Sequence, residues 1–131
     1  MPAGSFAIPT SKTMELSDIT AQVQKAIAAS GITDGVCHVY NPHTTAGLTI
    51  NEGADPAVQT DILAALRKIV PLDLPYQHRE GNSPAHVMAS LVGSSVTVFI
   101  ENGRLQLGTW QKIFFCEFDG PRSRKVLWRI V

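Results

Sequence analysis

The stretch SVTVFIENGRLQL constrains the fold more than any other part of the chain. A strand-like run lies on each side of Asn102-Gly103, the dipeptide typical of a two-residue type I′ turn. The residues that would face each other across such a turn are complementary. Opposite charges meet at the tip, and apolar side chains meet beyond it. These pairs are Glu101 with Arg104, Ile100 with Leu105 and Val98 with Leu107. The stretch therefore predicts an antiparallel hairpin of fixed register.

Two of the helices that we expect have a typical capping residue at the start and a glycine at the end. Asp18 is placed to cap a first helix, and Gly31 is placed to end it. Residues 83–93 predict a short helix in which Ser83 is the cap and Gly93 the stop.

A further helix is predicted between these two, beginning at Asp55-Pro56, where a capping side chain precedes proline at the first helical position. Its apolar residues recur at helical spacing and predict a buried stripe: Val58, Ile62, Leu66 and Ile69. Residues 72–84, which follow it, are polar and bounded by proline, as in a functional or lid loop.

The other segments are strand-like. Residues 5–16 predict a short hairpin or an extended entrance to the fold, and residues 35–41 and 46–51 predict strands. Two more strands are joined at Asp119-Gly120-Pro121. This order predicts an α+β fold with two to three helices and a largely antiparallel sheet, rather than a doubly wound parallel sheet.

Length and charge limit the class of protein. The chain has 131 residues, which predicts a single domain over 1–131. Lys+Arg and Asp+Glu both number 11, so we expect neither a nucleic acid nor a membrane as partner. We expect Cys37 and Cys116 to be buried and reduced. The sequence shows no leader pattern and no bilayer-spanning apolar run, so we expect a cytoplasmic protein.

Three of the four histidines are candidates for a site. His43, His78 and His86 fall at the ends of predicted elements or in a loop, where binding groups concentrate. Three neutral imidazoles can hold a metal ion and leave a fourth position open, although three unrelated surface histidines would give the same pattern. His38 alternates with apolar residues inside a strand and has a structural interpretation.

Other polar residues have two interpretations each. Glu52 has three functional interpretations: a metal ligand, a partner that orients a histidine, or a general acid–base. The alternative is a solvated charge in a turn. Thr44 and Thr45 either bind an anion or lead into a strand. Arg122 and Arg124, two apart, can both reach one phosphate, or else they are charges on a solvated strand edge.

Three blocks together resemble one known family. HTTAGLTINE, YQHREGN followed by AHVMASLVGSSVTV, and GRLQLGTWQKIFFCEFDGPRSRKV are similar in order and spacing to the YjbQ-like family, which includes proteins described as secondary thiamine-phosphate synthases. The resemblance implies an α+β fold with a mixed, barrel-like sheet, a homotrimer, and a pocket near the subunit interface. The site residues that it implies are His43, Glu52, His78, His86, Gln111, Arg122 and Arg124.

The activity implied is a weak transferase reaction. It joins a pyrimidine diphosphate to a thiazole phosphate and releases diphosphate. The three histidines would hold a divalent metal, more readily Zn²⁺ than Mg²⁺. Catalytic roles would fall to Glu52 and Gln111, and phosphate binding to the arginines with Thr44 and Thr45. Three alternatives remain: a module that binds or senses an anionic metabolite, a metal-assisted hydrolase of a phosphorylated metabolite, and a structural protein.

Subunit contacts are expected through the C-terminal strands. We expect that one small core does not bury all of the aromatic rings on both faces of a sheet. Exposed aromatic faces are typical of interfaces. The residues concerned are Phe99, Phe114, Phe118 and Trp128.

Overall fold

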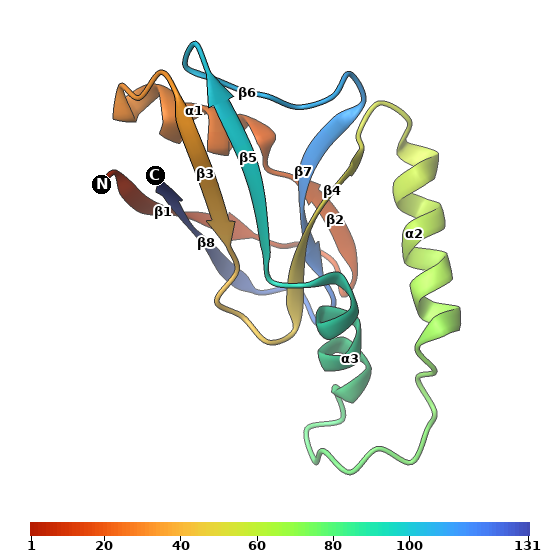
Figure 1. Cartoon of the computed structure of the whole chain (residues 1–131). Coiled ribbons are helices and arrows are strands. Elements are labelled where there is room, and N and C mark those ends of the chain that lie inside the picture. The colour runs from red at the N-terminus through yellow and green to blue at the C-terminus, as the bar shows by residue number, and fades with distance from the viewer.

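Eight strands and three helices follow one another in the order that the sequence predicts (Figure 1). The structure, a computed structural model, describes residues 1–131. The strands are β1 Ala3–Pro9, β2 Glu15–Asp18, β3 Gly35–Tyr40, β4 Ala46–Glu52, β5 Ser95–Glu101, β6 Arg104–Leu105, β7 Gln111–Glu117 and β8 Ser123–Ile130. The helices are α1 Thr20–Ser30, α2 Pro56–Ile69 and α3 Ser83–Val92.

The strands form two sheets. One has the order β1-β8-β3-β5-β6 and the other the order β2-β7-β4. Every strand pair is antiparallel, and the sheets curl around a shared core as part of a barrel (Figure 1). The predicted α+β fold with a barrel-like sheet is confirmed. β1 and β2 lie in different sheets, so residues 5–16 form no hairpin.

The Asn102-Gly103 turn is confirmed, with φ of 53° and 73° at its two residues. Ile100 pairs with Leu105 and Glu101 with Arg104, as the sequence predicts. The ladder ends there, so the expected pair of Val98 with Leu107 does not form.

The main core lies between the sheets and is closed by α1. It contains inward-facing side chains of both sheets together with Ile19, Val23 and Ile27. Phe114 and Phe118 are also buried, so the expectation that they form an exposed aromatic face is wrong. Among the large aromatic side chains of the C-terminal strands only Phe99 is strongly exposed, at 65 %.

The N-terminal caps of α1 and α3 differ from the prediction by one residue. Asp18 Oδ1 accepts a hydrogen bond from the Thr20 N–H at 2.9 Å, but the residue before α1 is Ile19. Gly31 ends α1 in the left-handed conformation, at φ 72°, as expected. α3 begins after Asn82 rather than after Ser83.

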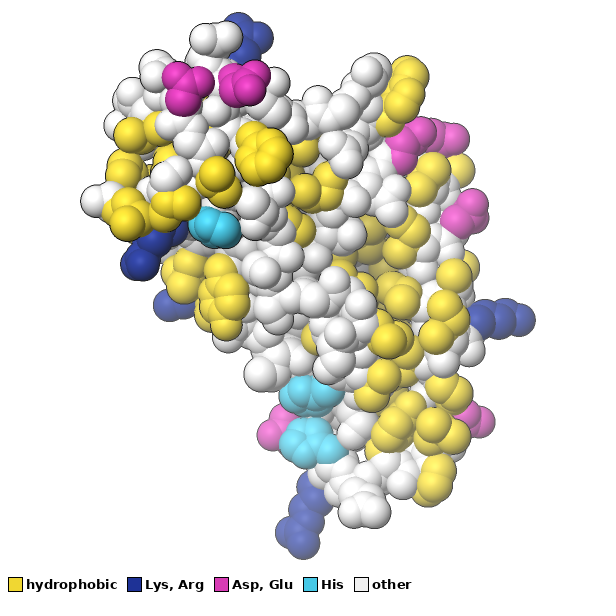
Figure 2. Space-filling view, in the orientation of Figure 1, with side chains coloured by type: hydrophobic (Ala, Val, Ile, Leu, Met, Phe, Trp, Pro, Cys, Tyr) yellow, Lys and Arg dark blue, Asp and Glu magenta, His cyan; other side chains and the backbone are white.

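α2 begins as predicted but packs differently. Asp55 caps it by accepting the Ala57 N–H at 2.9 Å. No side chain of α2 is buried, and Ile69 is 65 % exposed, so the expected buried stripe is wrong. Figure 1 shows α2 along one side of the sheets, and apolar side chains gather along this side in Figure 2. The apolar face of α2 therefore lacks a full partner within the chain. None of the three helices combines the length and apolarity needed to cross a membrane.

Candidate functional site

A cavity of about 410 Å³ lies where four segments of the chain meet. They are the connection between β3 and β4, the loop between α2 and α3, the first turns of α3, and the start of β8 with the turn before it. None of the lining residues is hydrophobic. The cavity brings together most of the residues predicted from the sequence, namely His43, Thr44, Thr45, His78, His86, Arg122 and Arg124.

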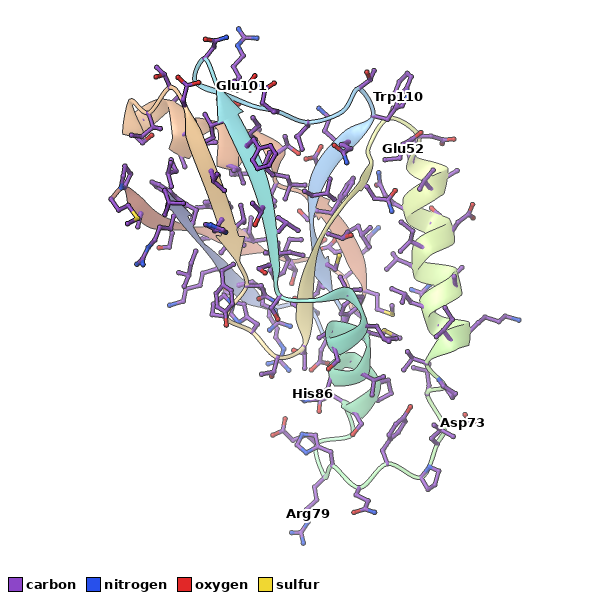
Figure 3. All side chains as sticks on the ribbon, in the orientation of Figure 1. Glu52, Asp73, Arg79, His86, Glu101 and Trp110 are labelled. Carbon is purple, nitrogen blue, oxygen red and sulfur yellow. The ribbon has the colours of Figure 1, made fainter.

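His78 and His86 are neighbours in this cavity. Their ring centroids are 5.3 Å apart and the rings are nearly perpendicular. Two imidazoles that share one tetrahedral metal ion have centroids about 5 Å apart, so the pair fits as two ligands. Figure 3 shows His86 at the end of α3 that faces the loop carrying His78.

His43 is held differently. Its Nε2 accepts a hydrogen bond from the backbone N–H of Lys125 at 3.0 Å, and its ring meets Phe115 edge-on with centroids 6.4 Å apart. Burial lowers the pKa of His43, and the charge of Arg124 lowers it further, so folding favours the neutral form of the ring. No three His, Cys, Asp or Glu side chains come together as a metal-binding group. All three histidines line the cavity, and the three-histidine metal site stays a prediction.

Arg124 lines the cavity, but its guanidinium is already paired. Nε donates to Glu117 Oε1 at 2.8 Å and Nη2 donates to Glu117 Oε2 at 2.5 Å. Nη2 also donates to Thr45 Oγ1 at 2.8 Å. Burial alone would raise the pKa of Glu117, but the hydrogen bonds from Arg124 and Thr10 outweigh it and lower that pKa overall. Arg124 therefore reaches the cavity as one half of a buried ion pair, with its guanidinium already engaged by Glu117 and Thr45.

Arg122 keeps part of its guanidinium free. Its side chain is 51 % exposed and forms an ion pair with Asp119 at 2.9 Å. Nε and Nη2 are both engaged by Asp119, whereas Nη1 makes no hydrogen bond. Asp119 also accepts from Asn82 Nδ2 at 2.8 Å, so it links Arg122 to the residue that precedes α3.

Asn82 is the one lining residue with a buried polar atom that lacks a partner. Its Oδ1 is buried and has no hydrogen-bond partner, the only such side-chain atom in the structure. Buried polar atoms are nearly always paired, so this oxygen is suited to a ligand or water in the cavity.

The chain matches the family described as "UPF0047 protein YjbQ-like" over residues 4–131. The chain belongs to this family. It is 50 % identical over 126 residues to UPF0047 protein MJ1081 of Methanocaldococcus jannaschii, covering 96 % of this chain and 91 % of that protein. UPF0047 protein YugU of Bacillus subtilis is 52 % identical over 121 residues, 92 % of each chain.

Solved structures of YjbQ-like proteins agree in fold. An uncharacterised YjbQ/UPF0047 protein of Clostridium acetobutylicum has a TM-score of 0.94 at 54 % identity, over 97 % of this chain and 98 % of that one. Hypothetical protein APE1520 of Aeropyrum pernix has a TM-score of 0.94 at 36 % identity, over 100 % and 98 %. These names state no activity.

Two residues implied by the YjbQ-like resemblance lie elsewhere. Glu52 pairs with Gln111 at the far end of β4, whereas Ala46 pairs with Glu117 at the cavity end, about 20 Å away. Glu52 Oε2 accepts from the Asp55 N–H, and Gln111 accepts from a backbone N–H in its own turn, both at 2.8 Å. Figure 3 shows Glu52 beside Trp110, at the opposite end of the molecule from His86. A single chain therefore keeps these two residues away from the histidines.

The sequence interpretation missed Glu117, Asp119, Asn82 and Glu80 as parts of this YjbQ-like site. One signal was present for Glu117, because a lone carboxylate in the apolar run IFFCEF requires a buried cation. Asp119 lies in a turn and Asn82 lies before a helix, and both are common there for local reasons.

Proposed function

We propose that this protein binds a phosphorylated small molecule in the histidine cavity and acts on it as an enzyme. The observation that carries the proposal is the lining of the cavity, which has no hydrophobic residue and is rich in donors. Arg122 offers a free Nη1, and guanidinium groups bind phosphate oxygens through charge-assisted hydrogen bonds. The Thr44 side chain adds a hydroxyl at the same wall.

The reaction that the YjbQ-like resemblance favours is the thiamine-phosphate synthase type, as a weak activity. A pyrimidine diphosphate and a thiazole phosphate are joined, and diphosphate leaves with the electrons of the broken bond. In this chain Arg122 would bind the departing diphosphate. His78 and His86 would hold a divalent metal, Zn²⁺ more readily than Mg²⁺, which would supply positive charge to the leaving group.

A non-enzymatic binding or sensing module is the second candidate. Glu52 and Gln111 lie away from the cavity in one chain. Glu80 is the only carboxylate among the residues that line it. Binding needs Arg122 and the polar wall, whereas turnover also needs groups that move protons.

We also propose a homotrimer in the cytoplasm. A neighbouring copy would cover the apolar face of α2, which its own chain buries only in part. It could also bring Glu52 and Gln111 to a cavity that their own chain does not reach. Both cysteines are buried and free, which is typical of a reducing compartment.

The experiment compares Arg122→Ala with Arg79→Ala, measuring the affinity for inorganic diphosphate by calorimetry. Arg79 belongs to the same loop as His78 but does not line the cavity, and its side chain points away in Figure 3. We expect Arg122→Ala to weaken binding about tenfold to a hundredfold, since each charge-assisted bond contributes about 1.5–3 kcal/mol. Arg79→Ala should bind as the wild type does. No difference between the two variants would contradict the proposed site.

Metal content and turnover distinguish the candidates further. His86→Ala should lose a bound metal that Arg122→Ala retains, as measured by elemental analysis. Release of diphosphate from the paired substrates would favour the enzyme. Tight diphosphate binding without any turnover would favour the binding module.

A further inference from the structure

The backbone N–H of Lys125 lies just beyond the end of a strand ladder. β3 ends at Tyr40, which pairs with Leu127 of β8. Alternate residues of a strand direct their N–H groups to the same side, so the Lys125 N–H points to where β3 has already ended. The His43 ring takes the place of the missing strand and accepts this N–H through Nε2 at 3.0 Å.

This contact fixes the proton of the neutral His43 ring. A nitrogen that accepts an N–H must carry a lone pair, so Nε2 is unprotonated and the proton of the neutral ring is on Nδ1. Nδ1–H is a donor and has no lone pair to offer a metal ion. Histidines that bind metals show the reverse arrangement, because their second nitrogen donates its proton to a carbonyl or carboxylate.

The ring cannot easily turn away from this position. Asn41 is buried, and its Oδ1 accepts a hydrogen bond from the backbone N–H of His43 at 3.0 Å. Its Nδ2 donates to the backbone carbonyl of Ala46 at 2.7 Å. Phe115 meets the ring edge-on. The backbone, the ring plane and Nε2 are therefore each held by a separate contact.

Nδ1 of His43 remains open to the cavity. No hydrogen bond within the chain involves it, and it is not among the buried unpaired atoms, so solvent reaches it. His43 lines the cavity that also holds His78, His86 and Arg122. A fixed donor there suits an anionic oxygen, because a neutral imidazole N–H can stabilise negative charge without exchanging a proton.

We propose that His43 is a fixed hydrogen-bond donor, through Nδ1–H, to an anionic oxygen of the bound ligand, and that it is not a metal ligand. The identity of that oxygen as phosphate rests on the proposed function above. Asn41 is a positioning residue for this donor.

Two substitutions separate the two nitrogens. The amide of His43→Asn lies where Nδ1 was and can still donate, whereas the amide of His43→Gln reaches the Nε2 position and can only replace the acceptor for Lys125. With inorganic diphosphate as the probe, we expect calorimetry to show affinity lowered about tenfold in His43→Gln and within about threefold of wild type in His43→Asn. Both variants should contain as much metal as the wild type. Loss of metal in both, or equal affinity of His43→Gln and wild type, would overturn the proposal.

A second measurement does not depend on any ligand. Imidazole ¹⁵N spectra of the wild type, with the His43 signals assigned from their loss in His43→Asn, should show a neutral ring protonated on Nδ1 near neutral pH. A ring protonated on Nε2 or bound to metal would refute the assignment. If the wild type binds no diphosphate, the proposed function fails, and the ¹⁵N spectrum still decides between donor and metal ligand.

Discussion

Replacing Arg124 by Met should destabilise the protein far more than a usual surface substitution. Glu117 has no exposed surface and receives two of its four hydrogen bonds from Arg124. The other two come from Thr10 Oγ1 at 2.7 Å and the Asp119 N–H at 3.0 Å. Arg124→Met leaves the carboxylate buried without its counter-charge. Breaking one side of a buried pair costs about 3–5 kcal/mol.

This loss should be large in a thermal melt. With about 2.1 cal/mol/K per residue, a chain of 131 residues has an unfolding entropy of about 0.28 kcal/mol/K. A loss of about 3–5 kcal/mol therefore lowers Tm by about 10–20 °C. The assay is circular dichroism at fixed protein concentration. Arg129→Met, an exposed position on the same strand, is the matched control and should leave Tm nearly unchanged.

The loss should also depend on pH. In the wild type the pKa of Glu117 is lowered on folding, so its stabilisation is present above the unfolded pKa and is lost as pH falls. Without Arg124, burial should raise the folded pKa above the unfolded one, so the variant loses stability as pH rises. The difference from wild type should thus shrink between about pH 7 and about pH 4.

The double substitution Arg124→Met with Glu117→Leu tests the cause. It removes the unpaired charge, so we expect it to recover most of the lost stability. The reasoning is refuted if Arg124→Met melts within about 2 °C of wild type at neutral pH, or if its loss is the same at both pH values.

Three further predictions concern packing and assembly. Gly47→Ala should cost about 1–3 kcal/mol in urea unfolding, because its Cβ would lie 2.9 Å from the Gly93 carbonyl oxygen; an unchanged midpoint would contradict this contact. Gly103→Ala should cost about 1 kcal/mol, since φ is +73° with open space around it, and a melt matching the wild type would argue against the turn. Ile69→Lys should weaken the proposed trimer in sedimentation at micromolar concentration, and a monomeric wild type would disprove the assembly.

The predictable part of the fold is local. The Asn102-Gly103 turn, the Asp55 cap and the Gly31 stop depend on backbone conformations that few residues adopt, so the residue types identify them. The buried stripe on α2 was a different kind of prediction. Periodicity shows that a helix has an apolar face, but what covers that face depends on residues far along the chain or on another chain.

The candidate site shows the same division. Residue types made the histidines and arginines candidates, the YjbQ-like resemblance grouped them in one site, and all of them line one cavity. The sequence pattern did not predict that Arg124 forms an ion pair with Glu117. That pairing depends on how β7 and β8 meet after the turn between them. The resemblance implies one site for His43 and Glu52, but the seven residues of β4 separate Glu52 from the cavity within one chain.

The partner of His43 at position 125 is a peptide group rather than a side chain. Every amino acid except proline supplies that N–H, so the lysine can be exchanged for many residues while the tautomer of the ring stays the same. Natural selection at this position would therefore act by excluding one residue rather than by keeping one. A survey that ranks positions by retained identity would pass over residue 125, although the protonation of the neighbouring imidazole depends on it.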